Sequence, residues 1–211
     1  MLMDLHVIDT GFFKLDGGAM FGVVPKQLWT RFKTPDSKNM VRWAMRCLLI
    51  SEGDRLILID CGIGNKQDEK FRSYFEPHGE ASLETSIQAA GYSLAEVTDV
   101  VLTHLHFDHC GGAVYRSADG KLLPSFPNAR YWSHEAHWNW AINPNPREAA
   151  SFLKENILPI QESGQLNYLD ESSKLVEGLD FFFVNGHTER MTIPKISYKG
   201  KTIVYMADLL P

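Results

Sequence analysis

The segment at residues 103–112 constrains this chain more than any other, because it sets three histidines and an aspartate in the pattern HxHxDH. The compact apolar run at 99–103, directly before the histidines, is typical of a short buried strand. A buried strand that ends in a burst of ionisable side chains is the architecture of a functional site. A polar loop with coincidental histidines is the alternative, and the pattern disfavours it.

The spacing of these side chains predicts two neighbouring metal positions. His104 and His106 are two residues apart at the end of a strand, where alternate side chains share a face, so both imidazoles can point at one ion. Asp108 and His109 follow where the chain must turn, and they can address a second position nearby. Imidazole and carboxylate ligands suit zinc, iron, manganese or cobalt, and a set without thiolate favours a catalytic centre over a structural zinc site.

Composition argues against several partners and environments. The 211 residues carry a formal charge of -5, so no overall positive field exists to attract nucleic acid. No window approaches the roughly 18 apolar residues of a membrane span, and the N-terminal segment lacks the pattern of a secretory signal. Cys47, Cys61 and Cys110 form no CxxC pair. We therefore expect free thiols in a reducing compartment, a cytoplasmic location and no membrane partner.

Periodicity predicts a mixed fold with β-rich stretches on both sides of a helical middle, within one domain over residues 1–211. Residues 43–50 and 55–59 indicate a hairpin around a turn-forming cluster. Further strands are expected at 99–103, 129–133, 179–184, 192–198 and 202–206. Helices are expected at 83–90, 134–142 and 147–162, the last two separated by Asn143-Pro144-Asn145-Pro146.

The HxHxDH block resembles the signature of the metallo-β-lactamase superfamily. The resemblance implies an α/β (α+β) fold, a four-layer αβ/βα sandwich with metals at one edge, and a third histidine and a bridging aspartate on later strand ends. His187, after the 179–184 strand, matches the third-histidine motif, and Asp208, after the 202–206 strand, matches the bridging-aspartate motif. Asp60, in Asp60-Cys61-Gly62, resembles an early turn aspartate that supports the metal loop without binding metal.

Carried over residue by residue, the resemblance implies two divalent ions, with zinc expected and iron or manganese as alternatives. One ion is expected on three histidines, the second on an aspartate and a histidine, with one further aspartate shared. These residues are His104, His106 and His187 for the first ion, Asp108 and His109 for the second, and Asp208 between them. The motif HLHFDH, with the aromatic Phe107 inside it, resembles the motif of N-acyl homoserine lactonases. Phe107 is the one candidate for contact with the substrate.

Three departures from the family pattern bear on these expectations. Glu189-Arg190-Met191 stands where many hydrolases of the family continue as Pro-Gly-His, and Ala207 stands where glycine is common. No histidine follows His187, although the family carries a last histidine on the second metal. The domain therefore looks truncated at its C-terminal part, and we expect the natural polypeptide to continue past Pro211 by roughly 50 to 80 residues.

The leading hypothesis is a metal-dependent hydrolase that attacks an ester, lactone or related acyl bond of a small molecule with hydroxide held between two metals. Asp108 is its catalytic residue, orienting the water and carrying the proton toward the leaving group. A thioesterase or a mononuclear-iron sulfur-handling enzyme of the same fold stays open. A non-catalytic protein stays open too, because the last metal-ligand histidine is absent. Self-association to a homodimer is also left open.

The remaining sequence features do not point to a second functional site. Nucleic-acid processing on this fold would require a basic groove or an appended domain, and the acidic balance shows neither. Oxygen-reducing diiron relatives have a glutamate where His106 stands. His134 and His137 are three apart on a predicted helix, a spacing that can bind metal, but the neighbouring tryptophans favour ordinary packing. Residues 17–22 indicate either a lid or a plain hairpin loop.

Overall fold

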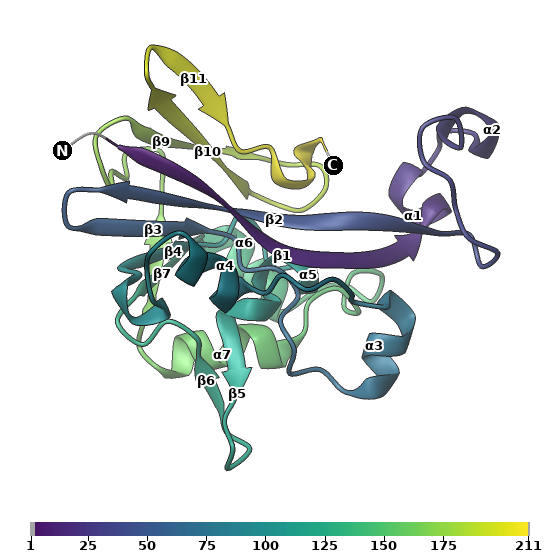
Figure 1. The fold of residues 1–211 in the computed structure, drawn as a ribbon, viewed down its shortest axis with the longest axis horizontal. Coiled ribbons are helices and arrows are strands. Elements are labelled where there is room, and N and C mark those ends of the chain that lie inside the picture. Colours follow the sequence, from purple (N-terminus) through teal and green to yellow (C-terminus); the bar gives the residue numbers. More distant parts are fainter. Residues whose placement is uncertain (1–2, 211) are drawn as a thin grey trace.

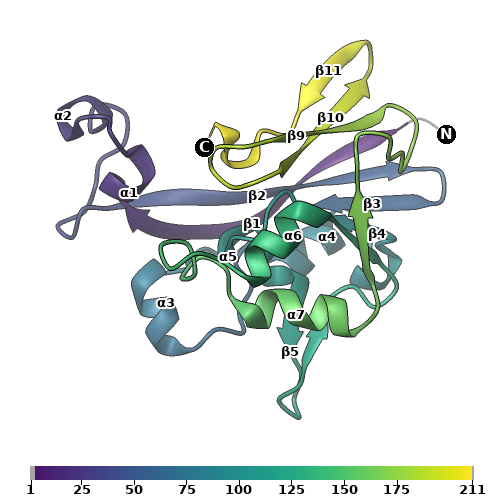
Figure 2. The same cartoon turned by 180° about the vertical axis from the view of Figure 1, so that it is seen from behind.

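Two sheets packed face to face form the centre of the molecule, and helices cover the other face of the larger sheet (Figures 1 and 2). The structure is a computed structural model that describes residues 3–210, so Pro211, where the expected continuation would start, lies outside the described residues. The larger sheet has six strands in the order β1-β2-β3-β4-β7-β8, and the smaller has three in the order β11-β10-β9. Strands β5 and β6 form a separate pair.

The strands are β1 (Asp4–Asp16), β2 (Met40–Glu52), β3 (Arg55–Ile59), β4 (Asp99–Val101), β5 (Val114–Arg116), β6 (Leu122–Pro124), β7 (Arg130–His134), β8 (Leu166–Leu169), β9 (Leu179–Val184), β10 (Met191–Tyr198) and β11 (Lys201–Val204). The α-helices are α1 (Gly17–Phe21), α2 (Lys26–Trp29), α3 (Glu69–Phe75), α4 (Leu83–Ala89), α5 (Phe107–Cys110), α6 (Glu135–Ile142) and α7 (Lys154–Glu162). Short 3₁₀ turns occur at Leu94–Glu96, Gly111–Ala113 and Ala207–Leu209. None of the described helices is long and apolar enough to cross a membrane.

Strand direction determines where the polar loops emerge. β1, β2 and β3 pair antiparallel, whereas β3, β4, β7 and β8 pair parallel. The carboxyl ends of parallel strands lie at the same edge of a sheet, so the segments after β3 and β4 leave side by side. In the smaller sheet β9, β10 and β11 form an antiparallel meander. The segments that follow β9 and β11 therefore start from one end of that sheet.

The apolar runs of the central strands are buried on both faces. In β3, Ile57 and Ile59 belong to the cluster between the two sheets, which also contains Phe181 and Ile196 of the smaller sheet. Leu58, pointing the opposite way, belongs to the larger cluster beneath the helices. Successive side chains of a strand point to opposite faces, so an uninterrupted apolar strand requires cover on both sides. Within residues 3–210 the helical layer and the two sheets supply three layers of the expected four.

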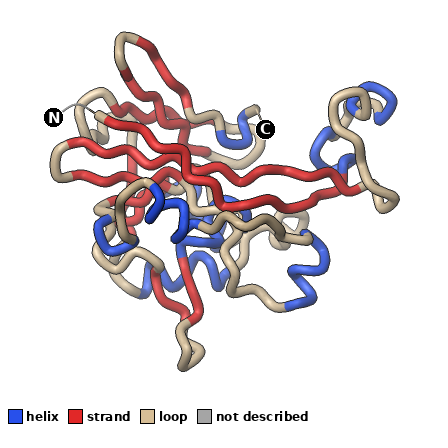
Figure 3. The backbone as a smooth tube through the Cα atoms, in the orientation of Figure 1, coloured by secondary structure: helices blue, strands red, loops and turns tan. Residues whose placement is uncertain are grey.

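The tube in Figure 3 shows the long strands β1 and β2 running together across the molecule. The predicted hairpin at 43–50 and 55–59 is confirmed, with the first strand extended to Met40. The strand β1 was not predicted, because a register shift between Asp9 and Phe12 breaks the alternation of its side chains. Of residues 17–22, interpreted as a lid or a hairpin loop, Gly17–Phe21 form the short helix α1.

The helix expected at 147–162 is wrong in its first part, because α7 begins only at Lys154. The side chain of Asn145 accepts hydrogen bonds from the backbone N–H groups of Arg147 and Glu148, which builds a turn in place of a helix. His134, expected in the other helix, is the last residue of β7, and α6 starts at Glu135. The three cysteines are buried and free, as the sequence predicts.

A substitution at Gly112 tests how tightly the segment after β4 is packed against the segment after β3. A Cβ atom at Gly112 would lie 2.2 Å from the carbonyl oxygen of Cys61, whereas one at Gly91 would meet nothing within 4 Å. Gly112→Ala must displace backbone and should lower the free energy of unfolding by about 3 kcal/mol. Gly91→Ala should lower the free energy of unfolding by only about 1 kcal/mol, because the strain comes from the left-handed backbone at φ 93° alone. Urea unfolding measures both, and equal losses would contradict the packing described here.

Candidate metal centre

Side chains from four loops meet where the strands of the two sheets end. Asp60 follows β3, and the HxHxDH segment follows β4. His187 follows β9 in the smaller sheet, and Asp208 follows β11. The predicted residues, far apart in the sequence, are therefore brought together by the topology of both sheets.

Three imidazoles form the first group. One ring nitrogen from each of His104, His106 and His187 lies within 4.8 Å of the other two. Nε2 of His187 is 3.0 Å from Nδ1 of His106, and Nε2 of His104 is buried without a hydrogen-bond partner. Ligand atoms placed tetrahedrally around one zinc ion lie about 3.3 Å apart. The three nitrogens thus have the spacing of a metal site, and Nε2 of His104 has an unused lone pair.

A second group consists of His104, His109 and Asp208, whose ligand atoms also lie within 4.8 Å of one another. The Asp208 carboxylate stands between the two groups, because Oδ2 is 3.2 Å from Nε2 of His187 and Oδ1 is 3.2 Å from Nε2 of His109. Asp108 belongs to neither group, although its Oδ2 is 3.5 Å from Nε2 of His109. The structure therefore gathers five of the six predicted ligands and leaves Asp108 at their border.

Asp60 holds two of the loops in place from below the cluster. Its backbone is left-handed at φ 61°, and its side chain is almost completely buried. Oδ1 accepts a hydrogen bond of 2.9 Å from the backbone N–H of Thr103, and Oδ2 accepts one of 2.9 Å from Nδ1 of His109. Since Nδ1 of His109 carries the proton, its Nε2 is free to face Asp208. Through these contacts Asp60 would support the metal loop, the role that the family resemblance implies for it.

Thr103 orients the ring of His104, a role that the sequence did not predict. Its hydroxyl has one proton, which it donates to Asp60. The same oxygen lies 3.1 Å from Nδ1 of His104 and can accept the proton of that ring. The chain from Asp60 through Thr103 to His104 leaves Nε2 of His104 as an acceptor pointing into the cluster. A polar residue just before the first histidine was the only available sequence signal.

Burial and neighbouring charge set the protonation of the cluster. Burial lowers the pKa of His104 well below its ordinary value and lowers that of His106 to about 3, so both rings are neutral, the form that binds metal. Burial opposes a proton on His109, but the carboxylates of Asp108 and Asp60 outweigh it and raise the pKa of His109 well above its ordinary value. Burial raises the pKa of Asp108. A divalent cation at this place would supply the positive charge that the His109 proton otherwise brings.

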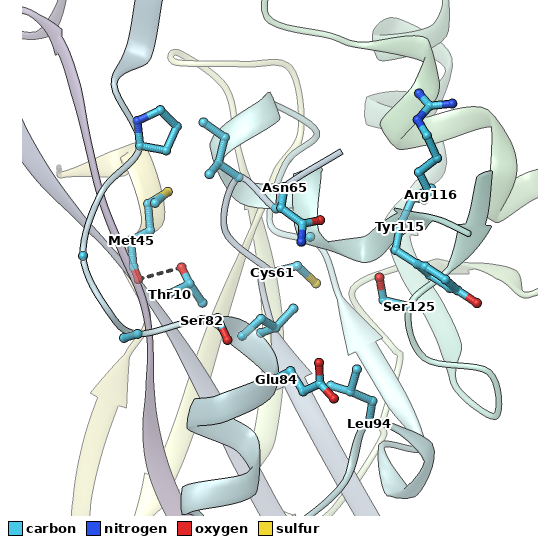
Figure 4. Close-up of a pocket in the computed structure, with 18 of the residues that line it drawn as sticks. Thr10, Met45, Cys61, Asn65, Ser82, Glu84, Leu94, Tyr115, Arg116 and Ser125 are labelled. Carbon is cyan, nitrogen blue, oxygen red and sulfur yellow. Dashed lines mark hydrogen bonds between the residues drawn. The ribbon is translucent and has the colours of Figure 1, made fainter. Parts of the chain in front are cut away.

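A cavity of about 420 Å³ borders the second group. Asp108, His109 and Asp208 line one side. The lining also includes the apolar side chains of Phe13 from β1, Met20 from α1, and Trp43 and Met45 from β2. A larger cavity of about 670 Å³, lined by Cys61, Ser82, Leu94 and others, contains none of the predicted ligands (Figure 4).

The remaining candidates lie outside both groups. Phe107 is buried with its ring against Phe71 and Phe75, and it does not line the cavity beside the cluster. Burial raises the pKa of the Cys110 thiol to about 12, as expected of an inert thiol. His134 accepts a hydrogen bond from the backbone N–H of Ala136 at the start of α6.

Residues 46–211 match the family model of the metallo-β-lactamase superfamily. The chain belongs to this superfamily. The expected metallo-β-lactamase fold is confirmed, since the match covers most of the chain and crystal structures with the same fold superpose on it.

Two solved structures and one curated sequence illustrate the similarity. A probable metal-dependent hydrolase from Staphylococcus aureus is 29% identical, with a TM-score of 0.90 over 99% of this chain and 74% of that chain. AidC, a dizinc quorum-quenching lactonase crystallised with its product, is 24% identical, with a TM-score of 0.77 over 99% of this chain and 72% of that chain. The transcription termination factor FttA of Methanocaldococcus jannaschii is 32% identical over 65 residues, which are 31% of this chain and 8% of that protein. The match to FttA thus spans a small part of that relative.

Asp60→Asn tests the hydrogen bonds beneath this superfamily site without straining the backbone, because asparagine also tolerates the left-handed conformation. The Thr103 N–H and His109 Nδ1 donate to different oxygens of Asp60, and an amide puts an NH2 donor in place of one of them, so one of the two bonds is lost. We expect a loss of about 2 kcal/mol in the free energy of unfolding, measured with urea. Thr103→Ser, which keeps the hydroxyl, is the control and should stay near the wild-type value. Wild-type stability of Asp60→Asn would contradict the assigned bonds.

Proposed function

We propose that this chain is a metal-dependent hydrolase that cleaves an ester, lactone or related acyl bond of a small molecule at a centre of two divalent ions, with zinc as the expected metal. The observation that carries the proposal is the position of Asp208. Its two carboxylate oxygens face His187 in one candidate group and His109 in the other. A carboxylate between two sets of nitrogen ligands fits a bridge between two cations.

Family membership and the structural neighbours support the hydrolase part of the proposal. The superfamily match covers residues 46–211, and the Staphylococcus aureus neighbour is described as a probable metal-dependent hydrolase. The neighbours described as lactonases, including one with product bound at its catalytic metal centre, favour acyl bonds. At 24% and 18% identity they support this chain's fold, so the substrate class is our proposal.

The proposed roles follow from where each side chain lies. His104, His106 and His187 would hold one cation, and His109 and Asp208 would hold the second, with Asp208 shared. When bound, the two cations supply a water of lowered pKa and polarise the scissile carbonyl. Asp108 lines the cavity beside His109 and would hold a proton and pass it toward the leaving group.

The cavity supports a small substrate with an apolar part. Its volume of about 420 Å³ falls within the range of small-molecule sites. Phe13, Met20 and Trp43 line the same cavity as the carboxylates and give it apolar surface, which suits the carbon chain of an acyl group. Buried free thiols agree with the cytoplasmic location expected from the sequence, and that location and a homodimer both stay predictions.

Metal analysis tests the centre directly. The purified wild-type chain should contain two divalent ions, and His187→Ala should lose one of them because the first ion then keeps only two histidines besides the shared Asp208. The control is His78→Ala, an exposed histidine outside both groups, which should keep two ions. Elemental analysis by mass spectrometry makes the measurement. A single iron would favour the sulfur-handling alternative, and no metal in a folded chain would favour a non-catalytic protein.

Asp108→Ala tests the proton-transfer role. It should lower kcat on a good ester or lactone substrate by roughly 100- to 10,000-fold, the usual contribution of a positioned acid or base. Asp119→Ala, which removes an exposed carboxylate from a loop, is the control and should leave kcat unchanged. The substrate is found by a screen of lactones, esters, thioesters and phosphotriesters. Full activity of Asp108→Ala would refute the role.

A further inference from the structure

His137 connects two of the loops that meet at the candidate centre. It lies in α6 and is completely buried. Its Nε2 accepts a hydrogen bond of 2.9 Å from the backbone N–H of Leu105, and its Nδ1 lies 2.7 Å from the carbonyl oxygen of Glu189. Helix α6 thus contacts both loops through a single imidazole.

The two backbone partners determine where the proton of this ring lies. The N–H of Leu105 can only donate, so Nε2 must be unprotonated. The carbonyl of Glu189 can only accept, so Nδ1 must carry the proton. Burial lowers the pKa of His137 to about 4, in agreement with a neutral ring. One neutral tautomer therefore satisfies both bonds, and an imidazolium would break the first.

The residues that His137 contacts are close neighbours of three predicted ligands. Leu105 lies between His104 and His106, and Glu189 lies two residues after His187. A second link joins the same parts of the chain, because the backbone N–H of Thr192 donates to the carbonyl of Thr103 over 2.8 Å. The two links lie on either side of His104, and together they fix the position and rotation of one loop relative to the other.

The loop on the Glu189 side departs from the family pattern, and the structure shows how it is closed. The side chain of Asn185 accepts a hydrogen bond of 2.8 Å from the backbone N–H of Arg190, whose φ is 50°. This turn directs the Glu189 carbonyl toward α6. The segment Glu189-Arg190-Met191 is thus held by contacts that include His137.

We propose that His137 is a positioning residue, which couples the His104–His106 segment to the His187 loop so that their three imidazoles face one ion. The proposal rests on the proposed function, because it requires that these imidazoles bind metal. A histidine that served only to fill the core would be replaceable by an apolar side chain of similar size without effect on metal affinity. The two roles therefore differ in a measurable quantity.

Zinc titration of the chelator-stripped, folded chain by calorimetry distinguishes a positioning role of His137 from a purely packing role. His137→Leu fills space but makes neither bond, and it should weaken one of the two zinc sites by roughly 10- to 100-fold. His137→Gln has a donor and an acceptor at its end and should restore most of that affinity. Asn139→Ala is the matched control. It changes an exposed side chain two residues further along α6, and it should bind zinc like the wild type.

Two results would overturn the proposal: wild-type zinc affinity in His137→Leu, or a loss in His137→Gln as large as that in His137→Leu. The tautomer gives a test without any variant. Nitrogen-15 NMR of the metal-free wild-type chain should show His137 protonated at Nδ1, and protonation at Nε2 would refute the coupling. A wild-type chain that binds no zinc would refute the proposed function instead, and the NMR measurement would still decide whether His137 joins the loops.

Discussion

Lone pairs that converge in a buried space are the constraint on which the rest of this structure depends. Nitrogen atoms of four histidines and the carboxylate of Asp208 face one another at the edge of the sandwich. Burial removes the water that would otherwise solvate them, and the neutral rings of His104 and His106 turn acceptor nitrogens toward one another. Asp208 and His109 offset part of this cost, because the raised pKa of His109 lets its ring donate to the carboxylate. A divalent cation would offset the remainder, since each of these atoms is a suitable ligand once it carries no proton.

The surrounding fold keeps that convergence in place through successive layers of contacts. Parallel strands β3 and β4 end at one edge, which brings Asp60 beneath the histidine segment. Asp60 orients His109 directly and orients His104 through Thr103, so both rings direct Nε2 inward. Gly112 allows the same segment to lie against the backbone of Cys61. The His187 loop comes from the other sheet, and a separate link to α6 sets its position.

The part of the site that lies in one local pattern was predictable from the sequence. HxHxDH after an apolar strand implies two metal positions by spacing alone, whereas His187 and Asp208 depended on the family resemblance. The contacts of His137 were not predictable, because they join residues 32 and 52 positions away with no local signal. Residues 147–151 look helical by composition, but the Asn145 side chain makes a turn there. The strand β1 was not predictable either, because its register shift interrupts the alternation of side chains that marks a strand.

The most direct test of a two-metal centre is anomalous X-ray diffraction from crystals grown with zinc, with data collected at the zinc absorption edge. We expect two peaks. One should lie among Nε2 of His104, Nδ1 of His106 and Nε2 of His187, and the other beside Nε2 of His109, with Asp208 between them. Crystals of the folded chain that show no anomalous peak at these side chains, with the imidazoles hydrogen-bonded to water or to one another, would contradict it.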